Sequence, residues 1–144
     1  MPQAETVWIL RHALRNLIKH GDTTALGILG YHPVKLKAVS LNVSPRKIPI
    51  GASITAELRV IASERQTRKL LIDWVMYYAR AGGRQSAKVF KGKEIELRAG
   101  DTVEFTKRFD LKPRSTRILH AGTHRLEVQI NGHIVAGEDF VLGT

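Results

Sequence analysis

The sequence has no cysteine among its 144 residues, which excludes disulfides, thiolate metal ligands and cysteine nucleophiles. The absence of cysteine fits a reducing compartment. No apolar run approaches the roughly 20 residues needed to span a bilayer, and the N-terminus, MPQAET, lacks the basic and apolar segments of a signal peptide. We therefore expect a cytoplasmic protein with no membrane partner.

Recognisable catalytic motifs are also absent. The sequence has no Gly-x-Ser-x-Gly elbow, and no glycine-rich phosphate loop follows a predicted strand and opens a helix. Of the six histidines, His120 and His124 are four residues apart, but they lie in a loop and at the start of a predicted strand and not on a helix. We expect no enzyme activity, no metal, no cofactor and no small-molecule substrate for this chain.

The longest strongly apolar two-residue period runs from Arg68 to Arg80. It predicts a central strand with one fully buried face, and a tryptophan in mid-strand is typical of a two-sheet sandwich. The residues of the buried face are Leu70, Ile72, Trp74, Met76 and Tyr78. On the opposite face, Asp73 could be an acid with a perturbed pKa, although we favour pairing with a neighbouring arginine or exposure on the sheet face.

Seven or eight short alternating segments follow Pro33, with no helical pattern between them. Asn131-Gly132 between the last two is a strong hairpin signal, because both residues tolerate positive φ. The pattern predicts a mainly β fold, an immunoglobulin-like antiparallel β-sandwich of 7–8 strands over residues 34–144. The predicted strands are Lys35–Val43, Ser53–Ala62, Lys69–Arg80, Ser86–Lys91, Lys93–Leu97, Thr102–Phe109, Thr123–Asn131 and His133–Leu142.

His124 occupies the place where immunoglobulin-like domains carry a tyrosine corner, near the start of the penultimate strand. In such a corner, the side chain bonds back to the backbone just upstream. We predict a histidine corner here, with an ordinary exposed histidine on a strand edge as the alternative.

The first 33 residues have a helical period instead. Apolar residues recur at helical spacing over residues 5–20, Gly21 is placed to end the helix, and Asp22 or Thr23 can cap a second short helix. We therefore expect a short α-helical pair in residues 1–33. The pair should either dock on the sandwich or form the last unit of a helical-repeat array, and we favour the array.

Charge is the unusual feature of the composition. The chain has 23 lysines and arginines against 13 aspartates and glutamates, a net charge of +10, and a pI near 10.3. Residues 1–33 hold three of the basic and two of the acidic residues, so residues 34–144 carry most of the excess. A pI above about 9 is typical of nucleic-acid-binding domains, although a solvated surface explains such charge equally well.

Basic residues on the predicted helix and in the loops are the candidates for contacts to a DNA backbone, because the forked donors of arginine match phosphate oxygens. If these residues form one face, double-stranded DNA is the expected partner; if they scatter, a protein-interaction module is favoured. No recognition helix or aromatic stacking platform indicates sequence reading. The candidates are Arg11, Arg15, Lys19, Arg84, Lys88, Lys107, Arg108, Arg114 and Arg117.

Several stretches together resemble the C-terminal part of the bacterial HEAT-repeat DNA alkylation repair proteins, the family of alkylpurine DNA glycosylases. The segments Trp8–Gly21 and Ala25–Tyr31 are similar to the last helical repeat. Three further segments are similar to a β-domain that one branch of the family appends: Lys88–Leu97, Lys107–Phe109 and Gly122–Gly132.

The resemblance implies a parent protein whose helical repeats grip duplex DNA and excise alkylated bases. Only the last helix pair has a counterpart here, so we carry over no catalytic residue. We expect a non-catalytic accessory domain that adds non-specific DNA-backbone affinity or packs on the N-terminal helical repeats of the parent. A protein-protein interaction module with no nucleic-acid role is the alternative.

Overall fold

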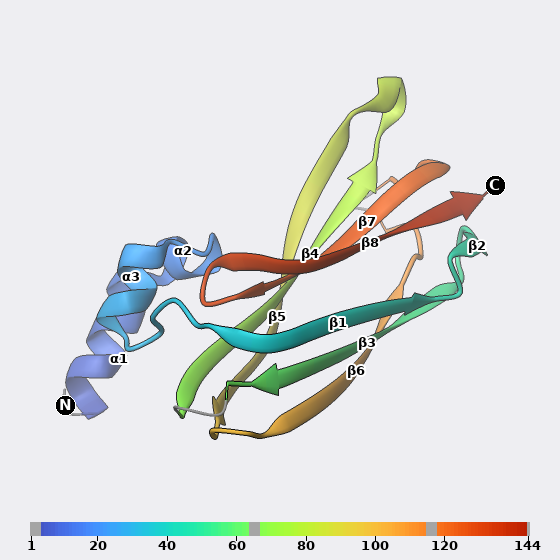
Figure 1. Ribbon diagram of the computed structural model, residues 1–144. Helices are drawn as coiled ribbons and strands as arrows, with labels where there is room; N and C mark the ends of the chain where they lie inside the picture. The colour runs from blue at the N-terminus through green and yellow to red at the C-terminus, as the bar shows by residue number, and fades with distance from the viewer. Residues whose placement is uncertain (1–3, 64–66, 115–117, 144) are drawn as a thin grey trace.

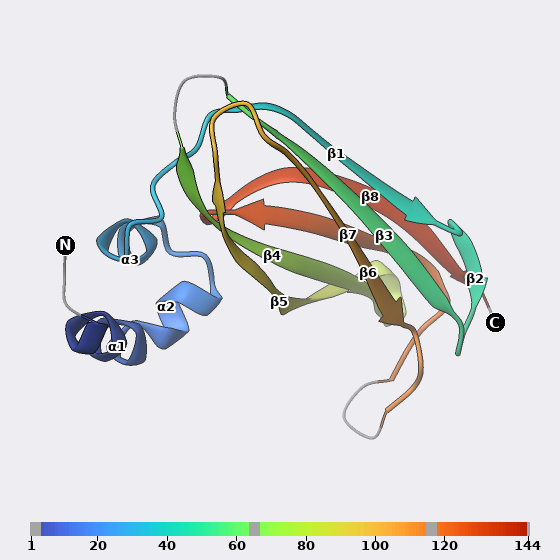
Figure 2. The same cartoon turned by 90° about the horizontal axis from the view of Figure 1, so that it is seen from below.

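Two β-sheets pack face to face, and three short helices lie at one end of the sandwich (Figures 1 and 2). This computed structural model describes residues 4–63, 67–114 and 118–143. One sheet has the strand order β1-β3-β6, and the other has the order β2-β8-β7-β4-β5. Neighbouring strands are antiparallel, except that β2 runs parallel to β8. The strands are β1 Leu36–Ser44, β2 Lys47–Pro49, β3 Ser53–Ala62, β4 Arg68–Ala79, β5 Gln85–Leu97, β6 Thr102–Asp110, β7 Gly122–Ile130 and β8 His133–Gly143.

The core forms where the inner faces of the sheets meet, as the alternation of apolar residues predicts. The predicted inner face of β4 is buried throughout, and Trp74 at its centre is 3% exposed. Its indole lies edge-on to the ring of Phe109 from β6, with 5.6 Å between the ring centroids. Each such aromatic residue removes a large apolar area from water, so this pair joins the two sheets. The predicted immunoglobulin-like sandwich with a short helical part is confirmed.

Two strand predictions need correction. The predicted strands Ser86–Lys91 and Lys93–Leu97 form one continuous strand, β5, which contains a bulge at Gly92. A Cβ at Gly92 would collide with the carbonyl oxygen of Ile72, so the bulge requires glycine. The segment 45–51 lies outside the predicted strands, but it contains the short strand β2. Only Ile48 of this strand is buried, and a single buried residue gives no two-residue period.

The helical part begins with a break that the sequence does not predict. Residues 5–20 form two helices, α1 Ala4–Ala13 and α2 Arg15–Lys19, separated at Leu14. The third helix, α3 Thr23–Ile28, is capped by Asp22, whose carboxylate accepts a hydrogen bond from the amide of Ala25 at 2.8 Å. Gly21 has a positive φ of 72° and ends α2, as expected.

The helices dock firmly on the five-stranded sheet. Leu26, Leu29 and Tyr31 form a second buried cluster, against which Leu71 of β4 packs from the sheet. Docking, the less favoured expectation, is therefore observed, while membership of a repeat array stays a prediction. No helix in the described part of the chain is long and apolar enough to cross a membrane.

Asn131 in the β7–β8 turn connects the helical part to the sheet. Its side-chain nitrogen donates to the carbonyls of His32 at 2.6 Å and Lys69 at 3.0 Å, and its side-chain oxygen accepts from the amide of Leu71 at 2.8 Å. The next residue, Gly132, lies so close to the carbonyl of Gly21 that a Cβ would collide with it. The hairpin turn thus holds the linker, β4 and the end of α2 together.

The histidine corner is present. His124 is completely buried, and its Nδ1 lies 3.1 Å from the carbonyl oxygen of Gly122, two residues upstream. The ring packs between Tyr78 and Phe140, with centroid distances of 5.9 and 5.4 Å. Since Nδ1 bonds a carbonyl, it carries the proton, and Nε2 is buried without a hydrogen-bond partner among residues 4–63, 67–114 and 118–143.

Candidate nucleic-acid interface

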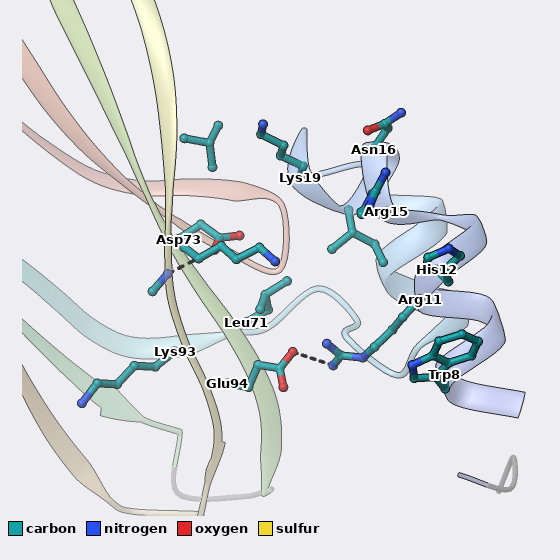
Figure 3. Close-up of a pocket in the computed structure, with 14 residues that line it drawn as sticks. Trp8, Arg11, His12, Arg15, Asn16, Lys19, Leu71, Asp73, Lys93 and Glu94 are labelled. Carbon is teal, nitrogen blue, oxygen red and sulfur yellow. Dashed lines mark hydrogen bonds and ion pairs between the residues drawn. The ribbon is translucent and has the colours of Figure 1, made fainter. Parts of the chain in front are cut away.

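A groove lies between helices α1 and α2 and the outer face of β4 and β5, with a volume of about 790 Å³ (Figure 3). The β7–β8 turn docks the helices at one end of the sheet, so that α1 and α2 face the outer side of β4 and β5 across this space. The lining side chains discussed below are Trp8, Arg11, His12, Arg15, Lys19, Leu71, Asp73, Val89, Lys91 and Glu94.

Three cations of this groove are available for a ligand. Arg15 and Lys19 come from α2 and Lys91 comes from β5. Within the described residues, none of the three forms an ion pair. Figure 3 shows Lys19 extending from α2 toward the strands. Because the three lie on both sides of one groove, an anion between helix and sheet would meet positive charge from both walls.

Arg11, a fourth cation of the groove, is already engaged. Its guanidinium lies 2.5 Å from a carboxylate oxygen of Glu94 on β5 and donates to the hydroxyl of Tyr31 at 2.9 Å. Burial opposes the charged guanidinium, but the bond to Glu94 and the charge of Glu94 outweigh it and raise the pKa of Arg11. Arg11 therefore links α1 to β5 and fixes the width of the groove. Because its guanidinium is already bound, it is not a free ligand for phosphate.

Asp73 lies on the floor of the groove, where only 8% of the residue is exposed. Its carboxylate accepts a long hydrogen bond of 3.4 Å from the amide of Gly92 at the bulge. Burial raises the pKa of Asp73 above its usual value, with repulsion from Glu94 adding to the effect, while the Gly92 amide and Lys91 oppose it. The favoured expectation, a paired or exposed Asp73, is wrong, because the bulge turns a backbone amide toward it and the helices cover the sheet above it.

Trp8 and His12 stand at the rim of the groove on α1. Their rings stack with 5.2 Å between centroids and 9° between planes, and Trp8 remains 65% exposed. An exposed tryptophan beside cations is a residue that can contact a base or a sugar.

The other predicted DNA contacts do not join this groove. Arg84 lies at the tip of the β4–β5 hairpin, which projects from the sandwich in Figure 1, and Arg114 follows β6 at an exposed position. Arg108 donates to the hydroxyl of Ser53 at 3.1 Å and pairs with Asp110 at 3.3 Å. Arg117 lies outside the described residues. The predicted contacts therefore scatter instead of forming one continuous face. This arrangement favours the protein-interaction module, and of the candidates that the structure describes only the helix residues Arg11, Arg15 and Lys19 lie in the groove.

Lys88 and Lys107 point inward along the edge strands. Their register partners are the buried residues Met76 and Ala56, so both lysines share the core side of their sheets. Lys88 lies 4.8 Å from the ring centroid of Phe90, and Lys107 lies 5.6 Å from that of Phe109. Inward charges on edge strands block pairing with other chains, which accounts for both lysines without a ligand.

Lys91 lines the groove but is not among the nine predicted DNA contacts. It stands opposite Asp73 in the β4–β5 register, but this pairing depends on the bulge at Gly92. The isolated glycine between two alternating runs was the one signal available, since glycine inside a strand pattern marks bulges. No group of three or more histidines and carboxylates able to hold a metal occurs among the described residues.

Comparison with known proteins identifies the family. Residues 37–144 match the family model described as "Uncharacterised protein YhaZ, C-terminal Ig-like domain". The chain belongs to the YhaZ C-terminal domain family. Protein YhaZ of Bacillus subtilis (strain 168) is 33% identical to this member over 136 residues, which are 94% of this chain and 38% of that protein.

A solved structure is similar to this chain over the helices as well as over the sandwich that the family model covers. Alkylpurine DNA glycosylase AlkC of Pseudomonas fluorescens, bound to DNA containing an abasic site analogue, is 32% identical, with a TM-score of 0.87 over 96% of this chain and 39% of that one. The chain thus spans about two fifths of either relative. The predicted resemblance to alkylpurine DNA glycosylases is confirmed.

A β-glucosidase of Listeria innocua shows how widely the sandwich occurs. It is 17% identical, with a TM-score of 0.60 over 80% of this chain and 17% of that enzyme. At this level of identity the likeness concerns the fold alone.

Proposed function

We propose that this chain is the non-catalytic C-terminal accessory domain of a DNA alkylation repair protein, and that its helix–sheet groove binds the DNA backbone without sequence preference. The observation that carries the proposal is the match to a DNA-bound alkylpurine DNA glycosylase over 96% of this chain. The charge of +10 and the unpaired cations of the groove support it. Localisation in the cytoplasm is part of the same proposal.

Arg15, Lys19 and Lys91 are the groove residues that contact phosphates. Each contact releases condensed counterions from DNA, so affinity falls steeply with salt. The ion pair of Arg11 with Glu94 links the two walls of the groove, which keeps these cations in place before DNA binds. Because phosphate contacts are independent of base identity, the domain adds affinity and not sequence selectivity.

Fluorescence anisotropy of a labelled short duplex, measured across a salt series, tests this proposal. Each phosphate contact contributes about 0.9 to the slope of log affinity against log salt. We expect the variant R15A/K19A/K91A to bind more weakly and to lose about 0.9 of slope for each contact removed.

A matched variant controls for net charge. K47A/R98A/K112A removes the same number of exposed cations outside the groove, and we expect it to keep most of the slope. If the two variants behave alike, DNA contacts are diffuse and the groove is not the interface. A wild-type chain that binds no duplex even at low salt contradicts the DNA role altogether.

Packing on N-terminal helical repeats of the parent protein is the second candidate role. The helices expose apolar side chains: Ile9 is 60% exposed, Leu17 47% and Ile28 51%. Burying these side chains against another helix pair would remove them from water, as stacked repeats do. The same surface would serve the alternative function, a protein-interaction module with no nucleic-acid role.

Titration calorimetry between this chain and the remainder of the parent polypeptide tests this role. We expect binding that the variant I9S/L17S/I28S weakens by at least about tenfold, because each truncated side chain contributes about 1 kcal/mol or more of apolar burial. The exposed pair I118S/V141S on the sandwich is the control. Equal binding of both variants contradicts packing through the helices.

A further inference from the structure

The groove has a negative floor between positive walls. Arg15 and Lys19 stand on α2, Lys91 on β5, and the carboxylate of Asp73 lies between them on β4. Figure 3 shows the Asp73 carboxylate directed into the space between strands and helices. A phosphate is attracted to the walls but repelled by the floor, so a ligand that fills the groove must present something other than phosphate to Asp73.

Asp73 has unused capacity to accept hydrogen bonds. An ionised carboxylate accepts about four hydrogen bonds, whereas within the described part of the chain Asp73 accepts one, the 3.4 Å bond from the Gly92 amide. Within the described residues no arginine or lysine pairs with it at contact distance. A buried carboxylate with so few partners is a strong acceptor for a donor that enters the groove.

The size and the walls of the groove fit one nucleotide. Its volume of about 790 Å³ falls within the usual range for sites that enclose small ligands, about 300–1,000 Å³. A duplex reaches the exposed side chains of Arg15, Lys19 and Lys91 from outside the groove, whereas a single nucleotide fits inside it. Leu71 and Val89 provide apolar wall surface, and the stacked rings of Trp8 and His12 stand at the rim. These surfaces suit the faces of a base, while the cations suit its phosphates.

We propose that the groove takes an unpaired nucleotide, with its phosphates on Arg15, Lys19 and Lys91 and its exocyclic amino group donating to Asp73. This inference rests on the proposed DNA-binding function and narrows it. Cytosine N4 and adenine N6 are such donors, whereas thymine has the carbonyl oxygen O4 in place of the amino group, and its ring N3–H is its one base donor. Single-stranded oligo-dC therefore binds this domain more tightly than single-stranded oligo-dT does.

Anisotropy with single strands of about 12 residues at neutral pH tests the inference. The wild-type chain binds oligo-dC about fivefold more tightly than oligo-dT, as one charge-assisted hydrogen bond allows. D73N removes the repulsion of phosphate and replaces the charged acceptor with a neutral amide oxygen, so its affinity for oligo-dT rises and the preference for oligo-dC falls well below fivefold. D101N removes an exposed carboxylate outside the groove and keeps the preference.

A change in the ligand makes the test independent of the variant's folding. Oligo-dC dimethylated at N4 has no amino hydrogen and binds the wild-type chain as weakly as oligo-dT does. Equal affinity for the three single strands, or a preference that persists in D73N, overturns the inference. If duplex then still binds with the expected salt slope, the proposed function stands; if neither duplex nor single strands bind, the proposed function fails as well.

Discussion

His124 places a titratable ring in a core that is otherwise built of apolar side chains. Its neighbours Tyr78 and Phe140 enclose it, and one bond to the Gly122 carbonyl fixes its orientation. Burial lowers the pKa of His124 below its usual value, and the backbone bond opposes this only in part. Protonation would put a second donor, on Nε2, where the structure offers no acceptor.

His124 should therefore make the domain acid-sensitive. A folded-state pKa below the unfolded value of about 6.5 means that the unfolded chain takes up the proton first, so stability is complete above that pH and falls as the pH drops below it. We expect urea unfolding to show this loss in the wild-type chain and less of it in H124F. H133Q, at an exposed histidine in the β7–β8 turn, should retain the wild-type dependence.

The raised pKa of Asp73 acts with the opposite sign and must be separated from this effect. Folding favours its protonated form, so the cost of burying the Asp73 charge is relieved as the pH falls through its folded-state pKa toward the unfolded value. The comparison of H124F with the wild-type chain cancels the Asp73 contribution, since Asp73 is present in both. A wild-type chain and an H124F variant with parallel pH profiles would contradict the account of His124.

Asn131 decides how the elements fit together. The hairpin turn at Asn131 was predicted from turn chemistry alone, and the positive φ of 50° at this residue agrees with it. Its three side-chain hydrogen bonds to the linker and to β4 could not be predicted, because they depend on which segments the folded chain brings to the turn. The same is true of Gly92: the sequence shows a glycine between two alternating runs, but only the packed sheet shows that one strand continues through it.

N131A should cost about 3 kcal/mol of unfolding free energy, because it leaves the half-buried Leu71 amide without its partner and places alanine at positive φ. N131G separates the two causes, since glycine tolerates this φ while losing the same hydrogen bonds; we expect it to cost about 2 kcal/mol. Urea unfolding measures both.

N42A provides the control for these variants, because Asn42 is exposed on the edge strand β1 and should change stability by less than about 0.5 kcal/mol. A cost of N131A no larger than that of N42A would show that the turn does not hold the helices to the sheet.

At the scale of the whole molecule, the periodicity of apolar residues determines the sandwich, whereas the docking of the helices on the sheet determines the groove. The sandwich follows from local patterns, since alternating residues such as Ile72 and Trp74 must all face one core. The groove does not, because it arises where α2 meets the β7–β8 turn, and no local pattern relates Lys19 to Lys91. The sequence indicated a basic protein with candidate arginines and lysines on the helix and in the loops, and the structure joins only the helix candidates with Lys91 and Asp73.

The most direct test of the central claim is to map duplex binding residue by residue in this 16.1 kDa chain by NMR. In a titration of the ¹⁵N-labelled chain with a short duplex, we expect the largest shifts at the amides of Arg15, Lys19, Lys91 and Gly92 and at the indole N–H of Trp8. Shifts that instead centre on the hairpin tip at Arg84 and on Arg114, or that leave the groove unchanged at saturation, would contradict the assignment of the groove as the DNA interface.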